Sequence, residues 1–116
     1  MGSIPRHLRI STRREIAWLL SGERVRGPQL DLYWRPASGP MPRATCITPK
    51  FGHSSVERNR LRRRLMALMR PHLLERAGER RDWLVRARPG SYGLGFAGLE
   101  AELSGLATRS GGETPA

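Results

Sequence analysis

Residues 54–69 of this 116-residue chain read SSVERNRLRRRLMALM and predict a long helix with two unlike faces. Ser54 and Glu57 have the spacing of a capping box, in which the serine oxygen and the glutamate carboxylate each bind a backbone N–H at the helix start. Apolar residues then recur at helical spacing and form one stripe: Leu61, Leu65, Leu68 and Met69. We expect the stripe to face the core and the helix to kink or end near Pro71.

The other faces of this helix are basic. Residues 58–64, RNRLRRR, contain five arginines and one asparagine, and Glu57 is the only acid nearby. Like charges one turn apart destabilise a helix by about 0.3 kcal/mol per pair, and no carboxylate stands four positions away to offset them. An ordinary solvated face and a phosphate-binding helix are both possible, and the missing acids favour the phosphate-binding helix.

The composition of the whole chain also favours a polyanionic partner. There are 21 Lys+Arg against 10 Asp+Glu, a formal net charge of +11, and 20 of the 21 cations are arginine. The arginine side chain binds phosphate through two N–H groups and stacks on bases, which suits RNA. No apolar run approaches the roughly 20 residues of a membrane span, and the basic N-terminus lacks the apolar block of a signal peptide. We therefore expect a cytoplasmic protein with no membrane partner.

Upstream of the basic helix, the pattern predicts another helix and then strands. Ser11 or Thr12 can cap a helix that ends near Gly22. Residues 29–34 alternate two faces, which predicts a strand, and a shorter strand starts at Val25. Residues 36–42 read as a turn because they contain Gly39 and three prolines, and residues 43–48 then form a strand that we expect to pair antiparallel with 29–34.

Downstream, residues 83–87 read as a buried strand stopped by Pro89 and Gly90. A last amphipathic helix is indicated by Phe96, Leu99, Leu103 and Leu106. The order predicts a single α+β domain, a sandwich in which helices pack on a small sheet. We expect it to span residues 9–108, with flexible ends at 1–8 and 109–116.

A family resemblance follows from these residues. The turn Lys50-Phe51-Gly52, the motif at 58–63 (RNRLRR), and residues 13–20 and 30–34 together resemble the ribonuclease P protein component. The resemblance covers about residues 9–108. It implies an α-β-β-β-α-β-α fold whose basic helix lies in a left-handed βαβ crossover, although about 98% of such crossovers are right-handed.

The resemblance also implies a function. The family forms a ribonucleoprotein endoribonuclease that removes the 5′ leader of precursor tRNA. Catalysis belongs to the RNA subunit with Mg²⁺, bound mainly by that RNA and the substrate, so no catalytic residue is expected here. The implied partners are the catalytic RNA and the precursor tRNA leader, with no protein partner.

Two sets of site residues carry over by position from the family. The set matching the motif that binds the RNA subunit is Lys50, Gly52, Arg58, Asn59, Arg60, Arg62 and Arg63. The set matching the leader cleft is Ile16, Leu20 and Tyr33. An exposed Tyr33 ring would stack a base at about 1–3 kcal/mol, and ordinary packing between helix and sheet is the equal alternative.

Several residues depart from the family pattern or suggest other chemistry. Ile16 and Leu20 stand where the family usually has aromatic residues, and Met66 replaces an arginine for which Arg64 or Arg70 can substitute. Asp31 stands at a usually apolar position, where it would repel phosphate or help hold a hydrated magnesium ion, which makes it a metal candidate. The three histidines, His7, His53 and His72, lie in separate segments, and the single cysteine, Cys46, reads as a core residue.

Two other classes of function fit the composition. A small ribosomal protein or ribosome-assembly factor without a catalytic role would explain the charge and the α+β order equally well. A duplex DNA-binding module is disfavoured because no helix-turn-helix or zinc-finger pattern occurs.

Overall fold

The computed structural model describes residues 4–50, 52–76, 78 and 80–111, and these residues are arranged around a four-stranded sheet. The strand order across the sheet is β1-β2-β4-β3. Strand β2 pairs antiparallel with both β1 and β4, whereas β3 runs parallel to β4. The strands are β1 (Glu23–Arg26), β2 (Leu30–Pro36), β3 (Ala44–Ile47) and β4 (Arg81–Ala87).

The pairing of β3 corrects one prediction. We expected residues 43–48 to pair antiparallel with residues 29–34, but β4 lies between β2 and β3. Trp83 of β4 stands opposite Trp34 on one side and Ala44 on the other. The physical reason is that residues 82–85 are all buried, and a strand covered on both faces takes a central position. The turn at Gly39 signals only that the chain reverses, and it does not fix which strand comes next to β2.

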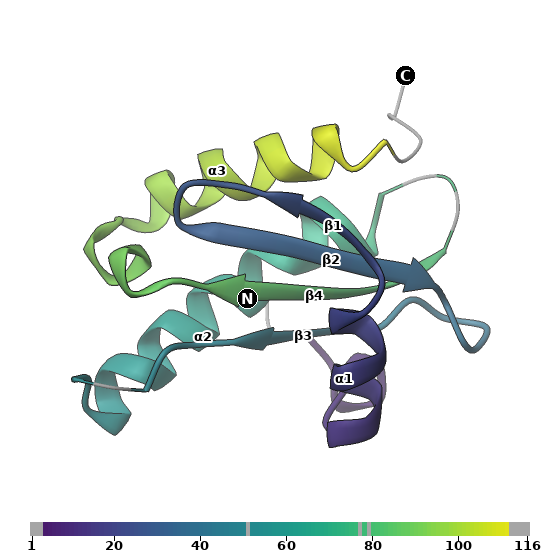
Figure 1. Ribbon diagram of the computed structural model, residues 1–116, viewed down its shortest axis with the longest axis horizontal. Helices are drawn as coiled ribbons and strands as arrows, with labels where there is room; N and C mark the ends of the chain where they lie inside the picture. The colour runs from purple at the N-terminus through teal and green to yellow at the C-terminus, as the bar shows by residue number, and fades with distance from the viewer. Residues whose placement is uncertain (1–3, 51, 77, 79, 112–116) are drawn as a thin grey trace.

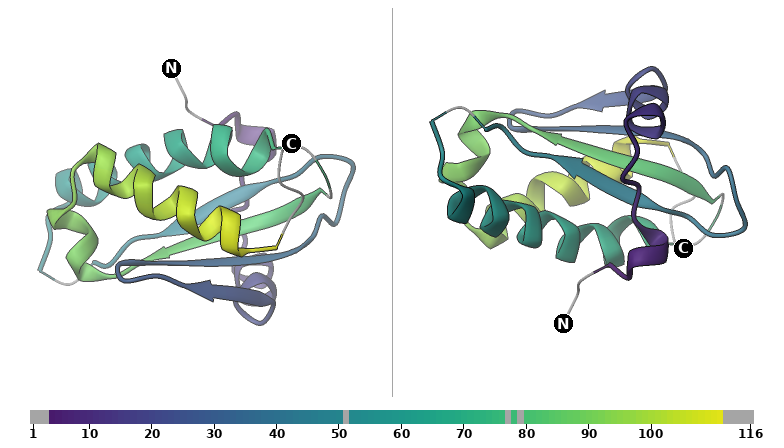
Figure 2. Two further views of the ribbon diagram at one scale, coloured as in Figure 1. Left: turned by 90° about the horizontal axis from the view of Figure 1, so that it is seen from above. Right: turned by 90° about the horizontal axis from the view of Figure 1, so that it is seen from below.

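Helices cover both faces of the sheet. α2 (Ser55–Met69) and α3 (Phe96–Arg109) lie on one face, and the short α1 (Arg13–Leu20) lies on the other (Figures 1 and 2). The main core lies between the sheet and the α2–α3 layer, where the rings of Trp34 and Trp83 have centroids 6.0 Å apart. A smaller cluster lies under α1: Ile10, Leu19, Tyr33 and Leu84.

The crossover from β3 through α2 to β4 is left-handed. Figure 1 views the sheet from the α1 side, with β3 and β4 pointing the same way, and Figure 2 places α2 behind the sheet. From the α2 side, with both strands pointing up, β4 lies to the left of β3. The rare handedness implied by the family resemblance is therefore confirmed.

Helix α2 begins and ends where the sequence predicts. The Ser54 hydroxyl accepts from the backbone N–H of Glu57, whose carboxylate accepts from that of Ser54, which completes the capping box. The helix ends at Met69 and continues as one turn of π-helix, residues Arg70–Leu74, in which the Glu75 N–H donates to the Arg70 carbonyl at 2.9 Å. This change of pitch accommodates Pro71, which has no N–H to donate.

The described part of the N-terminal end packs on the domain. Ile4 is 1% exposed in the main core, and its carbonyl accepts from Arg9 Nε at 2.8 Å. The backbone at Arg9 and Ile10 then runs along Ala44 and covers the outer edge of β3. Order thus begins before the boundary predicted at residue 9, because a lone apolar residue such as Ile4 gives no periodic signal.

At the other end, α3 runs through Gly105 to Arg109, and Ser110 is buried. Residues 112–116 of the predicted C-terminal tail lie outside the described residues. Phe96 opens α3 but is 46% exposed, so the apolar stripe of this helix starts at Leu99. Among the helices that the structure describes, none is long and apolar enough to cross a membrane.

Candidate nucleic-acid interface

Burial of one face of α2 determines which of its side chains reach solvent. The predicted stripe Leu61, Leu65, Leu68 and Met69 is buried in the main core, as expected. Met66 is buried too, at 7% exposure, which agrees with an apolar residue at this position of the helix. Asn59, Arg60 and Arg63 are exposed, whereas Arg58, Arg62 and Arg64 are partly buried. The helix therefore presents its charged groups to solvent on a rigid support.

The α2 arginines have no acidic partners in the described part of the chain. Arg58 reaches only the Ser55 hydroxyl, at 3.4 Å, and Arg63 Nε reaches the Asn59 carbonyl at 3.5 Å. The neighbouring Glu57 carboxylate serves the helix cap, and its pKa is lowered chiefly by the hydrogen bond from the Ser54 backbone. The negative charge of Glu57 thus stabilises the first turn of α2 and does not pair with an α2 arginine. The α2 surface, defined as Arg58, Asn59, Arg60, Arg63 and Arg64, keeps its positive charge available for a ligand.

Arg62 differs from the other motif arginines. Its Nη1 donates to the Cys46 carbonyl at 2.9 Å and lies 3.7 Å from the Cys46 sulfur. This contact ties α2 to β3, so part of the Arg62 guanidinium has a structural task that the sequence did not reveal. Burial raises the pKa of the Cys46 thiol to about 11, against the opposing charge of Arg62. A protonated thiol in the core agrees with the interpretation of Cys46 as a packing residue.

The turn before α2 is held in place by a stacked pair of rings. Gly52 has φ +80°, a left-handed conformation that favours glycine, and Lys50 is exposed beside it. The His53 ring stacks on Tyr92 with centroids 3.6 Å apart, and the Tyr92 hydroxyl donates to the Pro49 carbonyl at 2.7 Å. Lys50 and Gly52 therefore belong to a fixed entry into α2. Phe51 lies outside the described residues.

The predicted leader residues gather under α1, on the opposite face of the sheet. Ile16 and Leu20 are partly buried and pack against the cluster that contains Tyr33. Tyr33 itself is 4% exposed, so of the two alternatives for this residue, packing between helix and sheet prevails. The reason is that α1 lies directly over this part of β2. The α1 surface, defined as Ile16, Trp18 and Leu20, is what remains partly accessible.

Trp18 is a candidate that the sequence reasoning missed. Its ring is partly buried beside the α1 cluster, with the Arg35 guanidinium 5.3 Å from the ring centroid. Arg35 also donates to the Trp18 carbonyl at 2.6 Å and to the Ser21 hydroxyl at 2.7 Å. It thus provides a hydrogen-bond donor for a backbone carbonyl in the last turn of α1. An aromatic ring beside a cation can stack a base. The sequence did contain a signal for this residue, because Trp18 is the only aromatic residue in the helix predicted between Ser11 and Gly22.

Asp31 forms an ion pair and does not lie in a carboxylate cluster. Its Oδ1 accepts from Arg88 Nη2 at 2.7 Å, and its side chain is 7% exposed. The described residues contain no group of three or more His, Cys, Asp or Glu side chains placed to hold a metal ion. Asp31 therefore offers a single carboxylate that is already paired with Arg88, and Arg88 explains why an acid is tolerated at this position. The two residues line a cavity of about 350 Å³ together with Arg26 and Arg86.

The three histidines lie in different surroundings. His72 Nε2 is 3.0 Å from Glu100 and links the π-helical turn to α3. His53 stacks on Tyr92, and His7 is exposed in the N-terminal segment. In the described part of the chain, these side chains serve different elements and do not form a shared site.

Comparison with known proteins gives the same fold. The RNase P protein of Staphylococcus aureus superposes with a TM-score of 0.78 at 17% identity, covering 90% of this chain and 95% of that one. The RNase P protein of Thermotoga maritima gives 0.74 at 17% identity, covering 87% and 96% respectively. These likenesses establish the fold. The sequence model of the ribonuclease P family also matches residues 4–111. Because that match spans nearly the whole chain and includes both surfaces, the protein belongs to the ribonuclease P family.

Proposed function

We propose that this ribonuclease P protein subunit binds a catalytic RNA through its α2 surface and the 5′ leader of precursor tRNA through its α1 surface. The RNA would cut the phosphodiester bond, and the protein would strengthen substrate binding. The observation that carries the proposal is the set of exposed α2 arginines without a carboxylate partner among the described residues. Lys50 and Gly52 would contribute at the entry to the helix.

The electrostatics of α2 support an RNA ligand. Several guanidinium groups within two helical turns repel one another in the free protein. Folded RNA brings closely spaced phosphates that neutralise them and releases condensed counterions, which adds a favourable entropy. Asn59 both donates and accepts hydrogen bonds, so it can contact a base edge or a 2′-hydroxyl beside the phosphates.

The placement of the helices supports two simultaneous ligands. α2 and α1 lie on opposite faces of the sheet (Figure 2). A leader on the α1 surface would therefore not compete with an RNA subunit on the α2 surface. Ile16 and Leu20 would offer apolar contacts to unstacked bases, with Tyr33 supporting them from beneath and Trp18 adding an aromatic ring. Base stacking of this kind tolerates different sequences.

Magnesium belongs, in this proposal, to the RNA subunit and the substrate. The Asp31 carboxylate is paired with Arg88, and the described residues contain no group of three or more His, Cys, Asp or Glu side chains placed to hold a metal ion. Phosphate oxygens and water are the ligands that Mg²⁺ usually takes in nucleic-acid sites. The chain would act on the reaction by holding RNA and leader in place.

Cleavage at low magnesium tests the proposal. We expect the folded protein, added to a bacterial ribonuclease P RNA in limiting Mg²⁺, to restore cleavage of precursor tRNA at its mature 5′ end. The family match favours this function over that of a small ribosomal protein, which would give no stimulation. The Arg60→Ala/Arg63→Ala protein is the matched control, because it should fold equally well and stimulate less. A folded wild-type protein that leaves the cleavage rate unchanged would overturn the proposal.

A further inference from the structure

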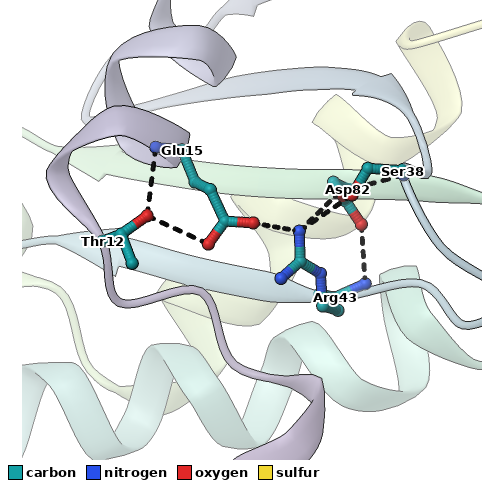
Figure 3. Close-up of polar contacts among 5 residues, drawn as sticks. All are labelled: Thr12, Glu15, Ser38, Arg43 and Asp82. Atoms are coloured by element: carbon teal, nitrogen blue, oxygen red, sulfur yellow. Dashed lines mark hydrogen bonds and ion pairs between the residues drawn. The ribbon is translucent and has the colours of Figure 1, made fainter.

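Arg43 links helix α1 to the buried interior of the sheet. Its Nη2 donates to Glu15 of α1, to Asp82 Oδ2 of β4 at 3.2 Å and to the Ser38 hydroxyl at 3.0 Å (Figure 3). The Arg43 backbone N–H also donates to Asp82 Oδ1 at 3.1 Å. One guanidinium group is therefore shared between an acid in the sheet and an acid on the helix.

The two acids are placed very differently. The Asp82 side chain is fully buried and also accepts from the Ser38 hydroxyl at 3.2 Å, which makes it a fixed anchor for Arg43. The Glu15 side chain is 29% exposed and belongs to a helix of eight residues. A helix this short is unstable by itself in water, so its position depends on its contacts. Loss of the Glu15 contact would free the N-terminal end of α1 while Arg43 stays paired with Asp82.

Different contacts hold the two ends of α1. Near its C-terminus, Leu19 is fully buried and Arg35 donates to the Trp18 carbonyl and the Ser21 hydroxyl. Near its N-terminus, Arg13 and Arg14 are exposed, and Glu15 makes the polar contact with the sheet. Without that contact, α1 would pivot about Leu19. Such a pivot would move Ile16 relative to the sheet and change the α1 surface.

We propose that Glu15 and Arg43 form a clamp, anchored by Asp82, that sets the position of α1 and thereby the geometry of the leader-binding surface. Both are positioning residues, since they act through Ile16, Trp18 and Leu20. The expected effect of the clamp on substrate binding rests on the proposed function, in which the α1 surface binds the leader. The clamp itself rests on the hydrogen bonds of Figure 3.

The test compares Glu15→Gln with Glu23→Gln in the reconstituted holoenzyme. Each substitution removes one negative charge, and Glu23 is exposed on β1 with no ion pair to a described residue. The readout is the ratio of the Kd for mature tRNA to the Kd for leader-bearing precursor tRNA. We expect Glu15→Gln to lower this ratio about two- to tenfold, the range of one partly exposed charge-assisted contact, and Glu23→Gln to leave it unchanged. Affinity for the RNA subunit should stay the same in both.

Hydrogen exchange in the free protein provides a readout that does not depend on the function. Backbone amides of α1 should exchange faster in Glu15→Gln than in Glu23→Gln, while those of α2 and α3 should not change. Equal α1 exchange in the two variants would overturn the clamp. A wild-type holoenzyme that does not prefer leader-bearing substrate would overturn the proposed leader site, and exchange alone would then decide the clamp. A normal wild-type preference that Glu15→Gln leaves intact would overturn the positioning role.

Discussion

The arginines of the α2 surface and two other arginines of the molecule, Arg43 and Arg88, are used in opposite ways. Around α2, Arg60 and Arg64 have no carboxylate partner among the described residues. Arg43, by contrast, pairs with Glu15 of α1 and with Asp82, and Arg88 pairs with Asp31. The difference shows that internal pairing determines which arginines are available to RNA. A net charge of +11 alone does not distinguish binding arginines from structural ones.

The basic motif also contains both kinds of arginine. Within the motif, Arg62 donates to the Cys46 carbonyl, and beyond the end of α2, Arg70 pairs with Glu75 at 3.1 Å. Arg64 has neither kind of contact among the described residues, so it is the better substitute for the family arginine that Met66 replaces. We therefore expect phosphate contacts mainly from Arg58, Arg60, Arg63 and Arg64.

The largest effect should come from breaking the anchor on the α1 side. Asp82→Ala removes a fully buried carboxylate, the anchor of Arg43 in the sheet, and leaves Arg43 with the Glu15 contact. We expect the free energy of unfolding to fall by about 3 kcal/mol, as when one member of a buried ion pair is removed. Urea denaturation measures it. Glu100→Ala, which removes an exposed acid beside His72, should cost less than about 0.5 kcal/mol. Equal losses would contradict the contrast between the two kinds of pair.

A moderate effect should separate the partly buried Trp18 from the buried Tyr33. Trp18→Ala should weaken binding of leader-bearing substrate to the holoenzyme about fivefold, because a stacked base contributes about 1–3 kcal/mol and Arg35 already covers part of the ring. Tyr33→Phe should change it less than about twofold, since Tyr33 is 4% exposed and its ring is retained. Fluorescence titration with substrates with and without the leader measures both. A larger effect at Tyr33 would mean that its hydroxyl reaches the leader.

The smallest effect is a pH dependence of the clamp. The hydrogen bond from Arg43 lowers the pKa of Glu15 below its usual 4.5, against the opposing effect of burial. A lowered pKa in the folded state means that this stabilisation is complete above about pH 4.5 and is lost as pH falls through the lower value. The difference in unfolding free energy between wild type and Glu15→Gln should therefore shrink on acidification below pH 4.5. Urea unfolding over pH 3–7 measures it, and a difference that persists undiminished at pH 3 would refute the ion pair.

Local features of the fold could be predicted from sequence because they depend on neighbours along the chain. The capping box at Ser54, the end of α2 before Pro71 and the cap of α1 at Thr12 all appear as expected. Each depends on residues a few positions apart. The apolar stripe of α2 follows from the same local periodicity.

The remaining features depend on residues that lie far apart in sequence. The insertion of β4 between β2 and β3 joins residues about forty positions apart, as in the pair Ala44 and Trp83. The pairing of Asp31 with Arg88 and the burial of Tyr33 beneath α1 have the same origin. The left-handedness of the β3–α2–β4 crossover was expected only from the family resemblance, because the hydrophobic periodicity of the sequence does not encode handedness. The predicted RNA-binding residues are gathered around α2, whereas their contacts with RNA remain predictions.

The salt dependence of binding to the RNA subunit tests the central role of α2 most directly. If Arg58, Arg60, Arg63 and Arg64 meet phosphates, log affinity should fall against log salt with a slope of about −3. Arg60→Ala/Arg63→Ala should flatten the slope by about 1.5. Arg24→Ala/Arg80→Ala, an equal change of charge at exposed positions outside α2, should leave it unchanged. Equal slopes for the two double variants would contradict the account.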